Sequence, residues 1–340
     1  MALKGGLAHS ILRGLRNSGL NIHRVSGERE LRAGVVGAGV FGRHHAVKYL
    51  RQPGVKLNAV ADPSADARRH VTAQLGVSAI PDWRGLLGQV DLVSICSPAS
   101  THAEIVLAFL SAGAHVLVEK PIATNLDEAK ALIALATHTG RVLTVGHQER
   151  YVFARSGLLD YADAPLSIEC VRAGPWTGRG TDVSAVLDLM IHDIDLVHRL
   201  VPGALSSVRA TGRTVYGKLA DEVTAQLTFA NGSEVELFAS RAADTRKRSM
   251  RVVYPDGEIE IDFLARTVRN TSARTFRPLE LHDPLAESVA GFVGAVRAGA
   301  NALVRPEEAQ LALETALCIE DAMEPAAEII AADEIIRASA

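Results

Sequence analysis

The feature that most constrains this chain is the stretch LRAGVVGAGVFG at residues 31–42, where an apolar run ends in the pattern G-x-G-x-x-G. Such a pattern predicts dinucleotide binding when a strand precedes it and a helix follows, and residues 43–50 are compatible with a helix. Gly37 would permit the tight turn, Gly39 the approach of a pyrophosphate, and Gly42 the packing of the helix on the sheet. The predicted cofactor-binding loop comprises Gly37, Gly39, Val40, Phe41 and Gly42.

A carboxylate twenty residues beyond this pattern strengthens the prediction. Asp62 follows a second apolar run, Val55 to Ala61, and the end of that strand would present it to a ribose diol. An acid at that point would repel the extra phosphate of NADP, so the sequence favours NAD as cofactor. An ordinary tight turn at residues 37–42 is the competing interpretation, and Asp62 makes it the weaker one.

Length and composition favour two domains and ordinary globular cores. The chain has 340 residues, of which 48% are hydrophobic, and a formal net charge of −3, which gives no bias towards nucleic acid or membrane surfaces. Three scattered cysteines support neither a disulfide framework nor a metal cluster, so we expect a reducing compartment, the cytoplasm. Within residues 1–30, the first 27 residues contain four lysines and arginines and no acidic residue. This composition resembles that of a transit peptide or a surface helix, but a plain N-terminal extension is the favoured interpretation.

Strands alternate with helical segments up to residue 147, which predicts a parallel, doubly wound sheet. Residues 31–147 are therefore expected to form a Rossmann domain that binds ligands at the carboxyl ends of its strands. Lys120 lies at one such end, directly after Glu119. A lysine there can lose part of its solvation and take part in proton transfer, but a solvated lysine paired with Glu119 explains the spacing equally well.

The segment 186–201, VLDLMIHDIDLVHRLV, predicts a helix. Its apolar side comprises Leu187, Met190, Ile194, Val197 and Val201, and we expect it to pack inwards. Asp188, His192 and Asp195 share another face, which predicts a titratable cluster facing a cleft or solvent. An exposed polar face is the alternative, although this face has no lysine, arginine or glutamate. A zinc site is disfavoured because no second histidine or cysteine has ligand spacing.

Extended segments dominate the chain beyond this helix. They are residues 207–214, 223–230, 233–239, 251–254, 258–263 and 267–270, with Asn231-Gly232 and Asp256-Gly257 as hairpin turns. Helices are expected to begin near Pro284 and Pro306. Residues 148–340 are thus predicted to form an α+β domain, an open antiparallel or mixed β-sheet with helices on one face. The other face would be wet or would bind a second subunit, so we expect a homodimer or homotetramer.

Five motifs in this order resemble the Gfo/Idh/MocA oxidoreductase family over nearly all of residues 31–340: GAGVFGRHHA, SICSPASTHAE, Glu119-Lys120-Pro121, VGHQERY and DLMIHDIDLV. The resemblance implies a Rossmann domain with an open-sheet domain, a tightly held nicotinamide cofactor, and oxidation or reduction of a sugar or cyclitol carbon. The family's lysine falls on Lys120, and its aspartate and histidine on Asp188 and His192.

Within this family, residues 174–196 are similar to the corresponding stretch of the UDP-N-acetylglucosamine 3-dehydrogenases. That similarity implies oxidation of the sugar at C3 to a ketone, for a later transamination in the synthesis of lipid A or a related glycan. The alternatives are a dehydrogenase of a free sugar or inositol, and an NAD-sensing regulatory protein without catalysis. The catalytic residues expected on this resemblance are Lys120, Asp188 and His192.

His192, oriented by Asp188, is the expected general base, and Lys120 would stabilise the substrate oxygen; the two roles could be exchanged. Nicotinamide and its ribose are expected near a further group of residues at the strand ends, namely Ser97, Pro98, His102, Glu119, Lys120 and Gln148. A substrate diphosphate needs cations. The candidates for binding the rest of the substrate are Arg150, Arg172, Trp176 and Arg179.

Overall fold

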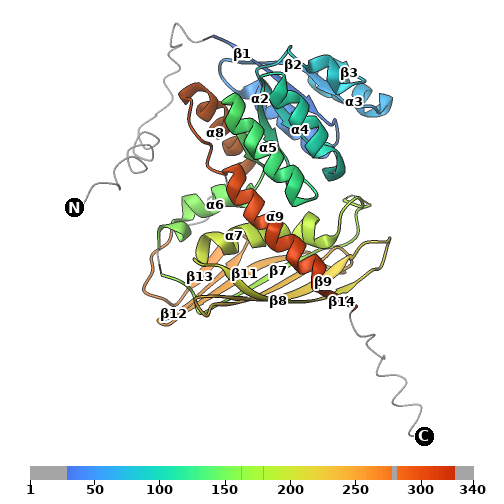
Figure 1. Ribbon diagram of the computed structural model, residues 1–340. Helices are drawn as coiled ribbons and strands as arrows, with labels where there is room; N and C mark the ends of the chain where they lie inside the picture. The colour runs from blue at the N-terminus through green and yellow to red at the C-terminus, as the bar shows by residue number, and fades with distance from the viewer. Residues whose placement is uncertain (1–28, 162, 179, 278–281, 326–340) are drawn as a thin grey trace, which may run out of the picture. The chain divides into compact units, whose positions relative to one another are not determined.

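The computed structural model describes residues 29–161, 163–178, 180–277 and 282–325, which form two β-sheets with their helices (Figure 1). The first sheet is six-stranded and parallel, in the order β3-β2-β1-β4-β5-β6. Its elements, in chain order, are β1 (Leu31–Val36), α2 (Val40–Arg51), β2 (Val55–Ala61), α3 (Ala65–Leu75), β3 (Ala79–Ile80), β4 (Leu92–Ile95), α4 (His102–Ser111), β5 (His115–Val118), α5 (Leu126–Thr139) and β6 (Leu143–Val145). This is the Rossmann arrangement that the sequence predicts.

The two helices α3 and α4 begin in different ways: one has a side-chain cap at its N-terminus and the other does not. Ser64 stands just before a helical segment, and its hydroxyl accepts a hydrogen bond from the amide of Ala67 and so caps α3. Thr101 and Glu104 have the sequence spacing of a capping box, which predicts a cap for α4, but the Thr101 side chain makes no such bond. The Thr101 hydroxyl instead donates to the Ser97 hydroxyl and the Pro98 carbonyl, because the chain makes a short 3₁₀ turn before α4 begins at His102.

The second sheet is eight-stranded and mixed, in the order β13-β12-β11-β7-β10-β9-β8-β14. Pairs β7–β10 and β8–β14 are parallel, and the remaining neighbours are antiparallel. Its strands are β7 (Ser167–Ala173), β8 (Leu205–Arg213), β9 (Glu222–Phe229), β10 (Glu234–Ser240), β11 (Lys247–Tyr254), β12 (Gly257–Asp262), β13 (Thr267–Asn270) and β14 (Met323–Pro325). Helices α7 (Ile191–Leu200) and α9 (Pro306–Asp321) lie together on one side of this sheet, which confirms the predicted fold class (Figure 1).

The helix predicted over residues 186–201 begins with a π-helical segment, Val186–Met190, and continues as α7. All five residues of its predicted apolar side are buried: Leu187, Met190, Ile194, Val197 and Val201. π-Helical turns within helices are frequent at functional sites. Here the segment carries Asp188, one of the predicted catalytic residues, at the start of the helix.

The C-terminal helices connect the two sheets. Helix α8 (Pro284–Ala298) packs on α2 and β5, and its Val289, Phe292 and Val293 share a buried cluster with Val35 and Tyr49 of the first sheet's core. Helix α9 contacts α5 and β6 as well as α7 and β8. Residues 284–298 therefore return to the first sheet, although their place in the sequence falls within the predicted second domain.

No helix in the described part of the chain is long and apolar enough to cross a membrane. The predicted N-terminal extension lies almost entirely outside the described residues.

Candidate active site

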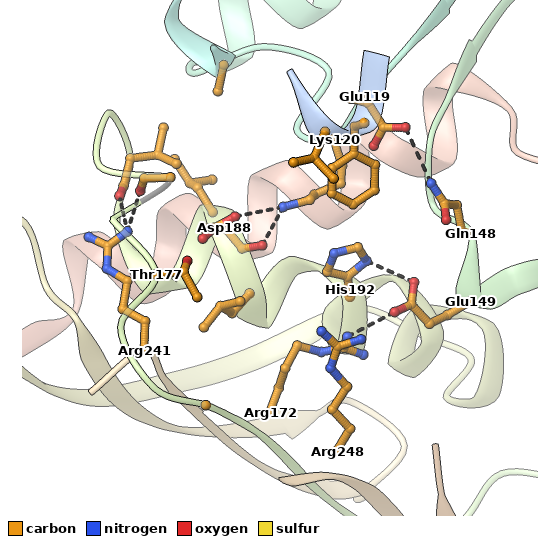
Figure 2. Close-up of a pocket in the computed structure, with 18 of the residues that line it drawn as sticks. Glu119, Lys120, Gln148, Glu149, Arg172, Thr177, Asp188, His192, Arg241 and Arg248 are labelled. Atoms are coloured by element: carbon orange, nitrogen blue, oxygen red, sulfur yellow. Dashed lines mark hydrogen bonds and ion pairs between the residues drawn. The ribbon is translucent and has the colours of Figure 1, made fainter. Parts of the chain in front are cut away.

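A cavity of about 730 Å³ lies between the carboxyl ends of the first sheet's strands and the helix-covered side of the second sheet (Figure 2). One side, here called the first wall, comprises residues of the Rossmann domain: Gly39 to Phe41, Ser97 to Ala99, His102, and Glu119 to Pro121. The other side, the second wall, includes Glu149, Arg172, Trp176, Asp188, His192, Arg246 and Arg248. Most of the residues predicted to bind cofactor or substrate thus line one cavity.

The glycine loop fits a dinucleotide. Gly37 has φ of +95°, and a Cβ there would lie 2.6 Å from the backbone oxygen of Cys96. A Cβ on Gly42 would lie 1.7 Å from the oxygen of Gly37, so both positions exclude a side chain by contact with backbone. Gly39 has no atom within 4 Å of its Cβ position and lines the cavity, which leaves room for a pyrophosphate at the start of α2.

Asp62 lies at the end of β2, as predicted, and its carboxylate holds two backbone amides. Oδ2 accepts from Ala38 at 2.7 Å, and Oδ1 accepts from Ser64 at 2.8 Å. These bonds fix the glycine loop against the second strand. Each carboxylate oxygen keeps a further lone pair that a ribose hydroxyl could use.

Glu119 is buried in a hydrogen-bonded chain beneath the first wall. His45 Nε2 donates to Glu119 Oε1 at 2.8 Å, His45 Nδ1 lies 3.0 Å from the Ser94 hydroxyl, and Ser94 lies 2.8 Å from the hydroxyl of Tyr49. Burial would raise the pKa of Glu119, but the hydrogen bond and charge of His45 lower it below its ordinary value. Gln148 donates to the same oxygen at 3.4 Å, so Glu119 stays ionised beside Lys120.

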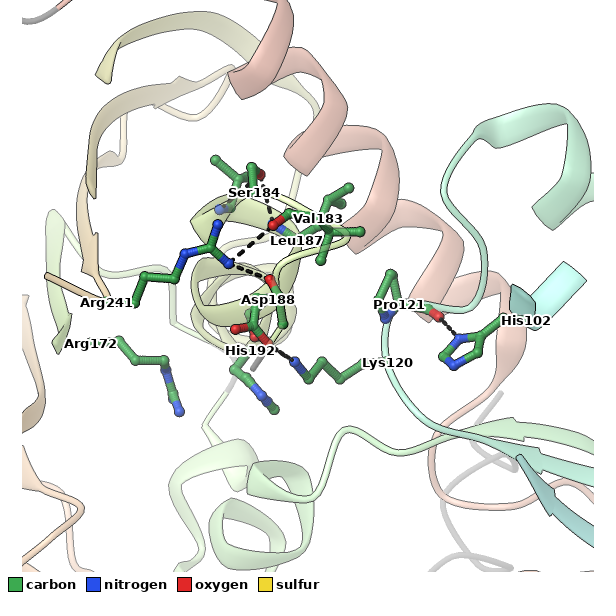
Figure 3. Close-up of polar contacts among 12 residues, drawn as sticks. His102, Lys120, Pro121, Arg172, Val183, Ser184, Leu187, Asp188, His192 and Arg241 are labelled. Atoms are coloured by element: carbon green, nitrogen blue, oxygen red, sulfur yellow. Dashed lines mark hydrogen bonds and ion pairs between the residues drawn. The ribbon is translucent and has the colours of Figure 1, made fainter. Parts of the chain in front are cut away.

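His102 joins two strand ends. Its Nδ1 lies 2.7 Å from the carbonyl oxygen of Pro121, and its Nε2 lies 3.0 Å from that of Ser97. Burial lowers the pKa of this imidazole. Both ring nitrogens are therefore engaged with backbone, and His102 supports the loops that carry Ser97 and Lys120 as well as lining the cavity (Figure 3).

Lys120 extends from the end of β5 to Asp188 on the π-helical segment (Figure 3). Its Nζ donates to Asp188 Oδ1 at 3.0 Å and also to the Asp188 backbone oxygen. Burial would raise the pKa of Asp188, but the charge of Lys120 holds it below its ordinary value. Of the two interpretations of Lys120, the pairing with Glu119 is therefore not the observed one: the partner lies on the second wall.

His192 contacts a different acid from the one predicted. Its Nδ1 lies 2.9 Å from Glu149 Oε2, whereas the carboxylate of Asp188 pairs with Lys120 (Figure 2). Burial would raise the pKa of Glu149, but the charges of His192 and Arg172 hold it well below its ordinary value. The prediction that Asp188 orients His192 is corrected accordingly. Because Nδ1 faces Glu149, Nε2 is the ring nitrogen available to a substrate.

Asp195 does not belong to this cluster, and Arg150 is not a cavity residue. Arg150 Nε and Nη2 donate to the two oxygens of Asp195 at 2.7 and 2.6 Å, and Nη1 donates to Glu308. Both Arg150 and Asp195 are buried, at 2% and 1% exposure. The helical spacing that groups Asp195 with His192 is wrong at this point because Asp195 turns into the core, where Arg150 neutralises it. Arg150 is therefore corrected from a substrate ligand to a structural residue.

The remaining substrate candidates have different surroundings. Arg172 lines the cavity, but its three nitrogens already donate to Asp193 and Glu149 at 2.8–2.9 Å. Trp176 lines the cavity and stacks on Tyr216, with ring centroids 4.4 Å apart. Arg179 lies outside the described residues.

Sequence reasoning missed three residues of the second wall: Glu149, Arg246 and Arg248. Glu149 belongs to the motif VGHQERY, and its position four residues after a strand end was a usable signal. The two arginines were missed because the predicted strand began at Arg251, whereas β11 begins at Lys247. Extending the alternation of that strand by three residues would have placed Arg248 on the same face as Met250.

The comparisons with known proteins agree with this architecture. Residues 31–147 match the oxidoreductase family with an NAD-binding Rossmann fold, and residues 152–260 match the GFO/IDH/MocA C-terminal domain. UDP-N-acetylglucosamine 3-dehydrogenase from Acidithiobacillus ferrooxidans is 38% identical over 239 residues, 70% of this chain and 76% of the relative. An inositol 2-dehydrogenase/D-chiro-inositol 3-dehydrogenase from Halalkalibacterium halodurans is 34% identical over 52% of this chain and 55% of its own length.

Solved structures of other dehydrogenases have the same two-domain fold. A structure of the Acidithiobacillus ferrooxidans enzyme superimposes with a TM-score of 0.81 at 34% identity, covering 87% of this chain and 99% of that one. Levoglucosan dehydrogenase in complex with NADH and L-sorbose shares the fold, with a TM-score of 0.77 at 20% identity, over 87% of this chain and 97% of its own. The predicted cofactor, NAD, is thereby confirmed. The chain is an NAD-binding oxidoreductase that belongs to the Gfo/Idh/MocA family.

Proposed function

We propose that this protein uses NAD to oxidise a secondary hydroxyl of a nucleotide sugar to a ketone, at C3 of UDP-N-acetylglucosamine. The observation that carries the proposal is the meeting of Lys120, from a strand end of the Rossmann domain, with Asp188 and His192 from the second domain in one cavity. That cavity also contains the open side of the glycine loop at Gly39. A sugar carbon and a nicotinamide could therefore meet there.

Each side chain has a role that its contacts support. The loop at Gly39 and the strand ends near Glu119 would hold NAD, which supplies the hydride acceptor for the hydrogen on the sugar carbon. The hydroxyl proton would pass to Nε2 of His192, and Glu149 beside Nδ1 would stabilise the imidazolium that forms. Lys120, held in place by its contact with Asp188, would donate a hydrogen bond to the same oxygen as it becomes a carbonyl.

The roles of the lysine and the imidazole could also be exchanged, as the sequence leaves open. In that version, Lys120 would take the proton and Asp188 would stabilise its charged product. The proton acceptor would still be one of two bases from opposite walls, because Asp188 is already paired and its pKa is lowered. The hydride transfer and the products are the same in both versions.

The substrate class rests on the relatives. The Acidithiobacillus ferrooxidans protein, whose name gives UDP-N-acetylglucosamine as its substrate, is 38% identical to this chain. Two inositol dehydrogenases are 34% and 26% identical, the second over 85% of this chain. The second candidate is therefore oxidation of a free sugar or inositol. A sensor of NAD without catalysis is disfavoured, because such a protein would not need Lys120, Asp188 and His192 together.

A substrate panel tests the proposal. Purified protein with NAD is offered UDP-N-acetylglucosamine, N-acetylglucosamine and myo-inositol, and NADH formation is followed by absorbance. A transaminase partner or a carbonyl trap removes the ketone, so that an unfavourable equilibrium does not hide turnover. We expect NADH with UDP-N-acetylglucosamine at a kcat/KM at least about 100-fold above that for the free sugars, since a missing charged contact costs at least this much. NADH formation from inositol alone would replace the proposal by its alternative.

A further inference from the structure

The arginines of the second wall differ in whether a carboxylate pairs with them. Arg172 is buried and pairs with Asp193 and Glu149. Arg241 donates to Asp221 at 2.6 Å and to the carbonyl oxygens of Val183 and Gly180, so it holds the glycine-rich loop that comes after β7. In the chain segments that the structure describes, Arg246 and Arg248 have no carboxylate within ion-pair distance.

Arg248 also lies beside another positive charge. It is the direct cross-strand neighbour of Arg172 in the antiparallel pair β7–β11, and both side chains lie on the face of the sheet that carries Cys170 and Met250. Figure 2 shows the two side chains rising together towards Glu149 and His192. Like charges directly opposite each other on a sheet are destabilising. Glu149 and Asp193 both pair with Arg172, so the positive charges of Arg246 and Arg248 have no carboxylate partner of their own among the described residues.

This excess charge faces the cavity. Both Arg246 and Arg248 line it, and the aliphatic part of Arg246 lies against Gly174, where a Cβ would be 3.4 Å from its Cγ. Desolvation and the charge of Arg172 lower the pKa of Arg248, with Glu149 and Asp193 opposing the effect. An anion bound at Arg248 would relieve the repulsion between its guanidinium group and that of Arg172.

We propose that Arg248, with Arg246 just before the start of β11 at Lys247, binds the diphosphate of the substrate. Both side chains line the cavity, and the two residues are two apart in the sequence. Two guanidinium groups from such neighbouring positions suit a ligand with two adjacent phosphates, each of which can accept two parallel hydrogen bonds. The inference rests on the proposed nucleotide-sugar substrate, and it assigns to Arg248 the role that the sequence suggested for Arg150, Arg172 and Arg179.

Binding of UDP tests the proposed diphosphate site directly, because UDP carries the diphosphate but no sugar that could be oxidised. UDP is titrated calorimetrically into NADH-saturated protein, with uridine as the matched ligand that lacks phosphate. Arg248→Gln is expected to weaken UDP binding about 10- to 100-fold and to leave uridine binding unchanged, because only the phosphates lose a charged partner. Lys247→Gln is the matched control. It removes the same charge one residue away, but its side chain is exposed on the other face of β11, so UDP affinity should stay within about twofold.

The outcomes separate this inference from the proposed function. Equal UDP affinity in Arg248→Gln and wild type, or no UDP binding by wild type, overturns the diphosphate site. Oxidation of UDP-N-acetylglucosamine with an unchanged KM in Arg248→Gln also overturns it, while the proposed function stands. UDP binding that depends on Arg248, without oxidation of UDP-N-acetylglucosamine, supports the site and contradicts the proposed sugar.

Discussion

The two walls of the cavity are built in different ways. The first wall depends on backbone: the tight turn at Gly37, the open approach at Gly39 and the strand ends that carry Glu119 and Lys120. The second wall depends on ion pairs between residues far apart in sequence, such as Arg150 with Asp195 and Arg172 with Asp193. Local sequence patterns can therefore specify the first wall, whereas the second depends on partners that only the folded chain brings together.

The ion pair behind the second wall should matter most for stability. Arg150→Met would leave Asp195 charged and buried without its partner, which costs about 3–5 kcal/mol. Urea denaturation measures the loss, and the folded variant should keep its KM for the sugar, because Arg150 does not line the cavity. Arg155→Met is the control. That arginine is half exposed and pairs with Glu287, so its loss should cost about 0.5 kcal/mol or less.

The protein should also lose stability in acid through His147, which follows β6 and lies behind the cavity beside His192. This imidazole is 1% exposed, lies beside His192 with ring centroids 6.3 Å apart, and has its pKa lowered to about 4 by burial, against the opposing charge of Asp195. As pH falls from 6.5 to 4, the unfolded chain takes up a proton that the folded chain does not, so stability falls by about 3 kcal/mol. Denaturation at several pH values should give a shallower decline for His147→Gln; an identical decline would contradict the assignment.

Lys120 belongs to the first wall, but its ion-pair partner, Asp188, belongs to the second wall. Lys120→Met should lower kcat by about 100-fold or more, because the reacting oxygen loses its charged donor. NADH binding should persist, since the glycine loop is untouched. Stopped-flow turnover together with NADH fluorescence separates the two effects. Unchanged turnover would remove Lys120 from the mechanism, whatever its contact with Asp188.

Gly42 and Gly39 differ in the space around them: Gly42 is crowded by backbone atoms, whereas Gly39 is open to the cavity. Gly42→Ala should destabilise the protein by about 1–3 kcal/mol, because its Cβ would overlap the Gly37 carbonyl. Gly39→Ala should leave the melting temperature nearly unchanged, as no atom lies within 4 Å of the added Cβ, but it should weaken NADH binding by filling the space for the pyrophosphate. Wild-type NADH affinity in Gly39→Ala would show that the cofactor does not approach there.

The smallest effect is expected at Glu149. Glu149→Gln keeps the shape but removes the negative charge beside His192, and kcat should fall about 10-fold. Glu169→Gln, on the exposed face of β7, is the matched control and should turn over like wild type. A kcat for Glu149→Gln equal to that of the control would mean that Glu149 only supports Arg172.

These differences explain what the sequence could and could not predict. The Rossmann domain is predictable from apolar runs and glycine spacing, and the eight-stranded sheet in outline from alternation and turns. Lys120, Asp188 and His192 came from family motifs. Helical spacing alone grouped Asp195 with His192, because a periodicity shows which residues share a face but not which of them turns inwards. Arg248 was missed because the start of one strand was placed too late. The helix at Pro284 was predicted, but its packing on the first sheet was not, because that contact joins segments far apart in the sequence.

Transfer of a sugar hydrogen to the nicotinamide tests the central claim most directly. UDP-N-acetylglucosamine deuterated at C3 is incubated with NAD and the protein, and the reduced cofactor is analysed by mass spectrometry and NMR. We predict that deuterium appears at C4 of the nicotinamide in wild type, with the product a 3-ketone, and that Lys120→Met forms the same species far more slowly. Reduced cofactor without deuterium, or deuterium retained in the sugar, would contradict hydride transfer from C3 between the two walls.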